Sequence, residues 1–289
     1  MSGFLENFDF CSNWFGSALA FLTVPEGHTI HRLAADLRKD FVGAPVSADS
    51  PQGRFSEGAA LVDGEKMLKS EAWGKHLFCH WESGNILHVH LGLIGKFRPV
   101  DPSLPPPDTI RLRLSNGSES WHLTGPQTCA MILADDLKQV VAKLGPDPLR
   151  LGVRGIRRFL QGLSSSNKPI GAALLDQSLL AGIGNVYRSE ILFLCGIHPE
   201  TPCNAITDHD GEKLWNLTVD LLRKGRKLNR IVTVQKEDSG NVPLSGNERE
   251  DSVYAYKREG LDCKRCPNQI QISSLAGRSM WHCPSCQEK

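Results

Sequence analysis

The stretch "LLDQSLLAGIGNVYRSEIL", from Leu174 to Leu192, indicates two helices that meet at a turn of small residues. Apolar residues recur at helical spacing on both sides of "AGIGN" (Ala181 to Asn185), whose glycines allow two backbones to approach closely. Asn185 would stand at the start of the second helix, where backbone N–H groups and the helix dipole favour an anion. Spacing alone leaves two interpretations open: an N-cap in an ordinary helical hairpin, or a phosphate-binding turn.

Helical patterns dominate the chain around this stretch. Residues 153–163, 170–180, 186–197 and 208–225 are amphipathic segments and predict four helices. The run "LLRKGRKLNR" (Leu221 to Arg230) places five basic residues within eight positions. Such a run is typical either of a solvated helix face or of a surface that contacts phosphates.

The N-terminal half predicts one helix followed by short strands. Apolar residues between Ile30 and Phe41 follow helical spacing, and Pro25 suits the first turn of that helix. From residue 46 to about 133, runs such as "HLFCHW" and "TIRLRLS" alternate with polar turns, which is typical of an antiparallel sandwich or barrel. The breakers in "KLGPDPLR" (Lys143 to Arg150) mark a domain boundary. We therefore expect an α+β chain with domains over residues 25–145, 146–250 and 251–289.

Four of the nine cysteines cluster near the C-terminus as C-x2-C-x16-C-x2-C. The set is Cys263, Cys266, Cys283 and Cys286. Two such knuckles joined by a hairpin predict a tetrahedral four-cysteine zinc site; two disulfides or free thiols are the alternative. Four protein ligands leave no open position, so the ion would be structural. Arg278, on the turn between the knuckles, would be held rigidly enough to recognise a phosphate.

Composition excludes several protein classes. The 289 residues carry a formal charge of +1, which argues against a chain that is basic overall. No run of 18 apolar residues occurs, so we expect no membrane span. The other five cysteines lie mostly in apolar surroundings and indicate a reducing compartment. Residues 1–24 lack the basic n-region of a secretion signal, and we expect a cytoplasmic protein acting at bacterial nucleoid DNA.

Five motifs, in order along the chain, resemble those of the formamidopyrimidine-DNA glycosylase and endonuclease VIII family of base excision repair enzymes. They are "PEGHTIHRL", "GKHLFCHW", "HVHLGLIGKF", "LDQSLLAGIGNVYRSEIL" and "YKREGLDCKRC…GRSMWHCPSCQ". The resemblance runs from about Pro25 to Gln287 and implies a β-sandwich with a flanking N-terminal helix, a helix–two-turn–helix domain and a zinc finger. It implies a bifunctional DNA glycosylase and abasic-site lyase that works through an iminium intermediate with β,δ-elimination.

The resemblance also implies catalytic roles. Pro25 would be the nucleophile that attacks the sugar C1′, and Glu26 would donate a proton to open the deoxyribose ring. Lys75 would act in β-elimination, and Arg278 would hold phosphate and assist δ-elimination. The chemistry agrees, because an N-terminal amine titrates near ~8, well below a lysine at ~10.4, and is therefore more readily unprotonated.

Contacts to damaged double-stranded DNA follow from the same resemblance, with one Zn²⁺ and a monomeric enzyme expected. His90 and Asn185 would contact the backbone beside the lesion. Lys143 falls where endonuclease VIII has a DNA-contacting arginine, so the charge is kept and the planar fork is lost. Leu93 would fill the space left by the extruded base, unless it belongs to the core.

Departures in the loops bear on the choice of lesion. The purine-specific branch fills the void with a methionine plus an arginine and a phenylalanine from a second loop. Here the first position is Leu93, and "HLTGPQTCAM" offers no Arg-x-Phe. This favours the endonuclease VIII branch and oxidised pyrimidines. Endonuclease VIII itself has a polar residue where this chain has Gly92, which puts one opposite-base contact in doubt.

The 24 residues before Pro25 conflict with this chemistry. Joined to Val24, the proline nitrogen is a tertiary amide whose lone pair is delocalised and cannot attack. We expect that residues 1–23 are translated upstream sequence and that Val24 is the initiator position. Proteolysis after Val24 is an alternative. A retained extension would make the chain an inactive damaged-DNA-binding relative. A zinc-ribbon protein for RNA or protein would leave Glu26, Lys75 and Asn185 unexplained.

Overall fold

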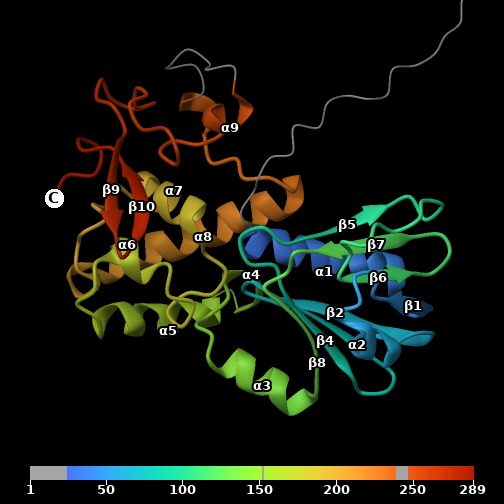
Figure 1. Ribbon diagram of the computed structural model, residues 1–289. Coiled ribbons are helices and arrows are strands. Elements are labelled where there is room, and N and C mark those ends of the chain that lie inside the picture. The colour runs from blue at the N-terminus through green and yellow to red at the C-terminus, as the bar shows by residue number, and fades with distance from the viewer. Residues whose placement is uncertain (1–24, 152, 239–246) are drawn as a thin grey trace, which may run out of the picture.

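The computed structural model describes residues 25–151, 153–238 and 247–289 of the chain. Figure 1 shows a β-rich body on the N-terminal side and a helical body that carries a two-stranded hairpin. This confirms the predicted α+β architecture, whereas the expectation about residues 1–24 lies outside the described residues. In the part of the chain that the structure describes, no helix combines the length and the apolar character needed to cross a membrane.

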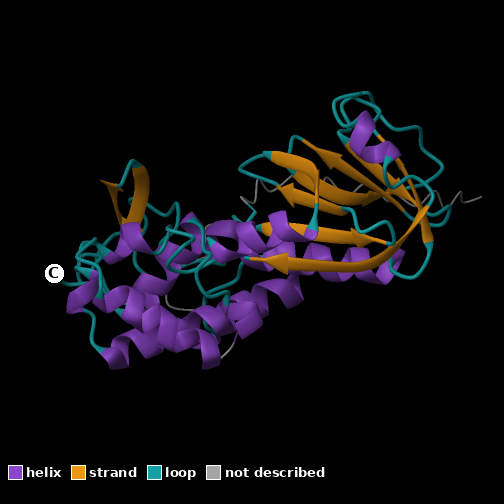
Figure 2. Cartoon of the chain, turned by 90° about the horizontal axis from the view of Figure 1, so that it is seen from below, coloured by secondary structure: helices purple, strands orange, loops and turns teal. Residues whose placement is uncertain are grey.

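The N-terminal body is a two-layered β-sandwich flanked by one long helix. Strand β1 is shared between the layers, because Pro45 and Val46 pair with β2 while Ser47 to Asp49 pair with β6. Figure 2 shows the two layers of strands. The elements are α1 (Gly27–Phe41), β1 (Pro45–Asp49), α2 (Ser56–Ala60), β2 (Glu65–Trp73), β3 (His76–Trp81), β4 (Ile86–His90), β5 (Lys96–Val100), β6 (Leu112–Ser115), β7 (Ser120–Thr124) and β8 (Thr128–Ile132).

Helix α1 covers the sandwich with the apolar stripe that its sequence predicts. Ile30, Leu37 and Phe41 are at most 1% exposed and pack with the strand side chains into one core. The helix lies on β2 and β3. Because α1 begins immediately after Pro25 and Glu26, this packing fixes where these two residues lie.

The helical body follows the "KLGPDPLR" break. Its elements are α4 (Pro148–Leu151), α5 (Val153–Ser164), α6 (Ile170–Ala173), α7 (Asn185–Cys195), α8 (Asp208–Leu228) and α9 (Glu248–Asp251), with short 3-10 turns at Cys203–Ala205 and Lys236–Asp238, whereas α3 (Ala134–Ala142) precedes the break. The predicted helices over 153–163, 186–197 and 208–225 are confirmed as α5, α7 and α8. Helix α3 was not predicted.

The predicted helix over residues 170–180 is wrong. Only α6 is helical, and turns continue from there to Ala181. Side chains compete with the helical backbone here: the Asp176 carboxylate accepts from the Ser178 N–H at 3.0 Å, and the Gln177 amide accepts from the Gly182 N–H at 2.9 Å and donates to the Ile183 carbonyl at 2.9 Å. This irregular connection places the glycines of "AGIGN" in front of α7.

The C-terminal hairpin pairs β9 (Gln271–Leu275) with β10 (Arg278–His282). Its two turn residues, Ala276 and Gly277, both have positive φ (52° and 72°), as a tight hairpin turn requires. The buried Arg188 of α7 donates to the Ser279 carbonyl at 2.8 Å and so docks the hairpin on α7. The sequence predicts Arg278 on the turn itself, but the structure places it just after the turn, as the first residue of β10.

A charged brace joins the two bodies. The Glu71 carboxylate of β2 accepts from Arg150 of α4 at 3.0 Å, and the Arg150 guanidinium also donates to the Ala72 carbonyl at 2.8 Å. Lys69 and His80 lie 2.8 and 2.9 Å from the same carboxylate. Burial alone would raise the pKa of Glu71, but hydrogen bonds from His80 and Lys69 and the Arg150 charge outweigh it and lower the pKa to about 2.

This brace predicts acid-labile stability. Because the folded-state pKa of Glu71 lies below its ordinary value of 4.5, its contribution is present above that value and is lost as the pH falls toward about 2. We expect Glu71→Gln to lower the free energy of unfolding at about pH 6 and to matter much less at about pH 3. Urea unfolding at both pH values measures this gap, which is the difference in the free energy of unfolding between wild type and the variant. The exposed Glu57→Gln serves as control, and an equal gap at both pH values would contradict the prediction.

Candidate active site

The start of α1 meets the "AGIGN" turn at a point of very close backbone approach. The Gly27 N–H donates to the Gly182 carbonyl at 2.7 Å. A Cβ on Gly27 would lie 2.9 Å from Gly182 Cα, and one on Gly74 would lie 3.0 Å from the Ala181 side chain. Side chains cannot be accommodated at these distances, so the glycines are what brings Pro25, the turn before α7 and the β2–β3 turn together.

Glu26 is buried at the N-terminus of α7. Its carboxylate accepts from the Gly184 N–H at 2.6 Å and from the Val186 N–H at 2.9 Å, and its side chain is fully shielded from solvent. Burial raises the pKa of Glu26, while the Lys75 charge and the α7 amides oppose this shift. The result is a carboxyl group next to Pro25 that is held in one position and takes up a proton more readily than an exposed glutamate.

Lys75 lies on the turn between β2 and β3. Burial lowers the pKa of the Lys75 ammonium group. The negative charge of Glu26 raises this pKa, and the positive charge of Arg278 lowers it further. Three side chains predicted to be catalytic, from three separate parts of the chain, therefore lie within electrostatic range of one another. An amine with a lowered pKa can exchange protons near neutral pH more easily than an exposed lysine.

Asp147 holds the turn that carries Lys75. Its Oδ2 accepts from the Gly74 N–H at 2.7 Å and lies 2.8 Å from His31 Nε2 of α1, while Oδ1 accepts from the Leu149 N–H at 2.8 Å. The Asp147 side chain is buried. One carboxylate thus ties the helical body to both N-terminal elements that contribute catalytic candidates.

We expect Asp147→Ala to slow strand cleavage while DNA affinity changes little. The substitution leaves the Gly74 and Leu149 N–H groups without their acceptor, at a cost of about 1–3 kcal/mol for each buried group. The Lys75 turn is then free to shift. Single-turnover cleavage and equilibrium binding to the same duplex separate the two effects. Asp135→Asn, an exposed carboxylate on α3, is the control. Equal losses of rate and affinity would argue against a positioning role.

Asn185 begins α7 and faces the hairpin. Its side-chain amide donates to the Ser279 carbonyl at 3.0 Å and accepts a short hydrogen bond from Arg188. The expected place of Asn185 at the start of a helix is confirmed. Because Ser279 follows Arg278, these contacts bring the hairpin and the N-terminus of α7 together as one polar surface.

A cavity of about 620 Å³ lies beside Pro25. Leu93 and Ile94, on the turn between β4 and β5, line it and are 62% and 71% exposed. Neither residue belongs to the core, which removes the alternative interpretation of Leu93. Gly92 precedes them with φ +68°.

The remaining DNA-contact candidates fall into two groups. His90 ends β4, and its Nδ1 accepts from the Gly92 N–H at 3.2 Å, so neutral His90 carries its hydrogen on Nε2. Burial lowers the pKa of His90, and the nearby Lys75 charge adds to this. Lys143 is exposed at the end of α3, which lies well away from the β9–β10 hairpin in Figure 1. The structure thus gathers His90 near Lys75 and leaves Lys143 at the periphery.

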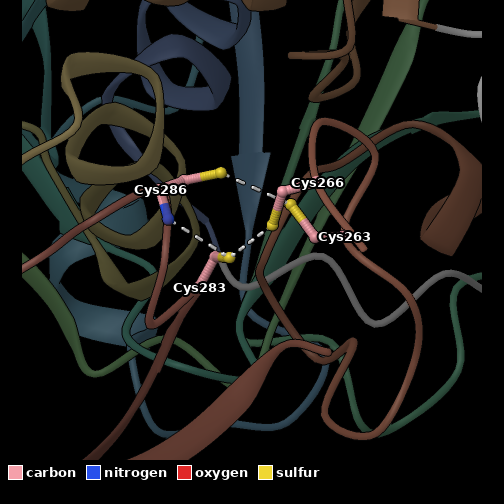
Figure 3. A group of neighbouring side chains, drawn as sticks. All are labelled: Cys263, Cys266, Cys283 and Cys286. Carbon is pink, nitrogen blue, oxygen red and sulfur yellow. Dashed lines mark hydrogen bonds between the residues drawn. The ribbon is translucent and has the colours of Figure 1, made fainter. Parts of the chain in front are cut away.

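The four C-terminal cysteines converge as their spacing predicts (Figure 3). All four sulfur atoms lie within 4.8 Å of one another. Cys263 and Cys286 are 3.8 Å apart and Cys266 and Cys283 are 3.4 Å apart, close to the ~3.8 Å between sulfurs at ~2.3 Å from one tetrahedral ion. Backbone N–H groups also point at Cys263 and Cys283. The site fits one metal ion with no open position.

Two buried acids escaped the sequence analysis. Asp147 lies in a segment that the sequence marks only as a linker. Glu190 accepts hydrogen bonds from the backbone N–H groups of Tyr254, Ala255 and Tyr256 at 2.7–2.9 Å and so anchors the four-cysteine segment to α7. The sequence signal for Glu190 was an acidic residue within an otherwise apolar helix pattern. Such a residue requires a hydrogen-bond partner when it is buried.

The comparisons with known proteins cover nearly the whole described chain. The formamidopyrimidine-DNA glycosylase N-terminal domain matches residues 24–131, and the formamidopyrimidine-DNA glycosylase H2TH domain matches residues 144–236. Endonuclease 8 1 of Mycobacterium tuberculosis is 40% identical over 269 residues, 91% of this chain and 100% of that protein. Formamidopyrimidine-DNA glycosylase of Thermus thermophilus is 30% identical over 234 residues, 79% of this chain and 85% of that protein.

A solved structure supports the same architecture. Lactococcus lactis formamidopyrimidine-DNA glycosylase, non-covalently bound to DNA with an AP site, superimposes with a TM-score of 0.75 at 25% identity. The match covers 91% of this chain and 100% of that chain. This two-domain fold is therefore one that binds DNA with an AP site in a relative.

Proposed function

Because the chain belongs to the formamidopyrimidine-DNA glycosylase and endonuclease VIII family, and is a DNA-binding glycosylase of base excision repair, we propose that it is bifunctional. It removes an oxidised base and then cleaves the strand at the resulting abasic site. The observation that carries this proposal is the Glu26 carboxyl, fixed by α7 amides beside Pro25 and within electrostatic range of Lys75.

Glycosylase chemistry starts at the Pro25 nitrogen. A free secondary amine attacks the sugar C1′, the bond from C1′ to the base breaks, and the base leaves with the bonding electrons and gains a proton. Glu26 donates a proton to the ring oxygen, which opens the sugar and leaves an iminium between C1′ and Pro25. The raised pKa of Glu26 supports this role because the group must be protonated to donate.

Strand cleavage then uses Lys75 and Arg278. Loss of a C2′ proton from the iminium expels the 3′-phosphate in β-elimination, and a second elimination expels the 5′-phosphate. Lys75 has the lowered pKa expected of a group that exchanges protons, and it also attracts a phosphate. Arg278, exposed on the docked hairpin, holds the phosphate that leaves.

Several side chains around the cleft bind the DNA around the lesion. His90 donates from Nε2 to a phosphate, and the Asn185 side-chain amide, at the start of α7 beside the hairpin, contacts the DNA backbone. Leu93, exposed on its turn, fills the gap left by the extruded base. Lys143 contributes charge from the edge of the surface. Zn²⁺ is the proposed ion of the four-cysteine site, where it stabilises the hairpin.

Oxidised pyrimidines are the proposed substrate class. The identity to endonuclease 8 1 is 40%, against 30% to the Thermus glycosylase, and the β7–β8 turn lacks an Arg-x-Phe pair. We further propose that the enzyme acts as a monomer in the compartment that holds the DNA.

Borohydride trapping on two duplexes tests the proposal. A chain that begins at Pro25 is incubated with a duplex containing one oxidised pyrimidine and, separately, one containing an oxidised purine. We expect a covalent adduct and strand cleavage, faster with the pyrimidine. Tight, salt-sensitive binding to abasic DNA with neither adduct nor cleavage would identify a damage-binding module instead. Faster processing of the purine would overturn the lesion class alone.

A further inference from the structure

Three histidines gather on one face of the β3–β4 strand pair. The register sets His76 opposite His90 and Phe78 opposite His88, so their four rings lie side by side on neighbouring strands. His76 Nδ1 lies 2.9 Å from His88 Nε2, and the ring centroids of His76 and His90 are 4.9 Å apart. The proposed chemistry uses His90 but leaves the His76–His88 pair without a role.

His88 is the fixed member of this cluster. It is 8% exposed, and the fully buried Phe78 ring stacks on it at a centroid distance of 4.8 Å. His76 is only half-buried and lies close enough to Lys75 for the ammonium charge to act on its pKa. Burial is the largest cause that lowers the pKa of His76 to about 3, and the neighbouring histidines and Lys75 add to it. The His76 ring is therefore neutral at neutral pH.

We propose that His76 donates a hydrogen bond to the phosphate bound at Lys75, and that His88 is the positioning residue that orients this donor. A neutral imidazole carries one N–H, so His76 can donate away from His88 only when its hydrogen is on Nε2. A phosphodiester oxygen only accepts, so it selects this tautomer, and His88 Nε2–H then donates to His76 Nδ1. This inference rests on the proposed function, because the phosphate is the one that Lys75 attracts.

The hydrogen bond between the two rings makes His88 decisive for this donor. In the opposite arrangement His76 donates from Nδ1 to His88, and its Nε2 presents a lone pair that repels a phosphate. A methionine at position 88 fills a similar volume and donates nothing. A glutamine there keeps an N–H donor at the end of a side chain of similar reach. These two substitutions separate the donor of His88 from its volume.

Binding to a duplex with an uncleavable abasic analogue tests the pair. We expect His76→Phe to weaken binding roughly tenfold, because one hydrogen bond to a charged group is lost while a ring remains. The dependence of affinity on salt should not change, since a neutral ring releases no counterion. His88→Met should weaken binding roughly threefold or more, whereas His88→Gln should keep the wild-type affinity. His209→Phe, at an exposed ring on α8, is the matched control.

Two further measurements separate positioning from packing. Nitrogen NMR of the DNA complex should place the His76 hydrogen on Nε2. The double variant His76→Phe/His88→Met should bind no more weakly than His76→Phe alone, because His88 acts through His76. Losses that add in the double variant, or a hydrogen on Nδ1, would overturn the inference.

Outcomes also separate this inference from the function on which it rests. If wild type binds the abasic analogue no more tightly than an undamaged duplex, the proposed function fails. If wild type prefers the analogue and His76→Phe keeps the wild-type affinity, His76 is not a phosphate donor. A weaker salt dependence in His76→Phe would show that the ring acts as a cation and would refute the neutral donor. Thermal unfolding verifies that each variant is folded before its affinity is compared.

Discussion

A chain that keeps residues 1–24 attached is expected to form no borohydride-reducible adduct with oxidised duplex DNA, whereas the chain beginning at Pro25 forms one. In the longer chain the Pro25 nitrogen is part of a tertiary amide, so its lone pair is delocalised and unavailable. The free secondary amine titrates near ~8, and a sizeable fraction is unprotonated at neutral pH. Gel analysis measures the trapped adduct for both chains. The adduct of the longer chain should fall below the detection limit.

Two controls make this comparison decisive. Acetylation of the shorter chain at Pro25 should abolish trapping while binding to an uncleavable abasic analogue persists, because acetylation restores an amide without removing the DNA-contacting residues. Mass measurement of the trapped product, after proteolysis, locates the adduct. Trapping by the longer chain, with the adduct on Lys75 rather than on Pro25, would refute the role of the proline.

Loss of one cysteine pair should detach the zinc hairpin and abolish cleavage. In Cys263→Ser/Cys266→Ser the site keeps two of its four thiolates, and structural zinc contributes roughly 10–16 kcal/mol to the folding of such small units. The hairpin displays Arg278 and supplies the Ser279 carbonyl that Asn185 and Arg188 contact, so its loss disorders that phosphate-binding surface. Metal analysis, hydrogen exchange across residues 262–287 and cleavage assays report the effect.

The rest of the protein should survive this change. Helices α5, α7 and α8 share a core to which the hairpin contributes one buried side chain, Met280, so far-UV circular dichroism should fall little. Cys129→Ser, a half-buried thiol on β8 away from the cluster, is the matched control and should keep one zinc ion and full activity. A double mutant that retains zinc and cleaves at the wild-type rate would show that the cysteines do not hold the ion.

Local pattern was sufficient for much of this protein. The stripe of α1, the strand β6 and the long helix α8 follow from periodicity, because each buries a face that repeats within its own sequence. The convergence of the four cysteines follows from their spacing for the same reason, since each pair lies on one tight knuckle. The adjacency of Pro25 and Glu26 is likewise a property of the sequence.

Periodicity failed where side chains replaced backbone partners. The apolar residues of 170–180 fit a helix, yet Asp176 and Gln177 satisfy nearby backbone groups and end α6 after one turn. Whether side chains can replace the helical hydrogen bonds here depends on the position of the turn that follows. That turn is fixed by the hydrogen bond from the Gly27 N–H, in the other body, to the Gly182 carbonyl. Nothing within the segment itself reveals this.

The sequence by itself determined most element types and the four cysteines that converge near the C-terminus, since these depend on residues near one another in the chain. The tertiary structure alone decided the environment of the acid and the lysine. Glu26 meets amides 158 and 160 residues away, and Asp147 reaches the Gly74 turn across 73 residues. The burial of these side chains and the pKa shift of Glu26 arise from contacts between distant segments, and these contacts exist only once both bodies have packed together.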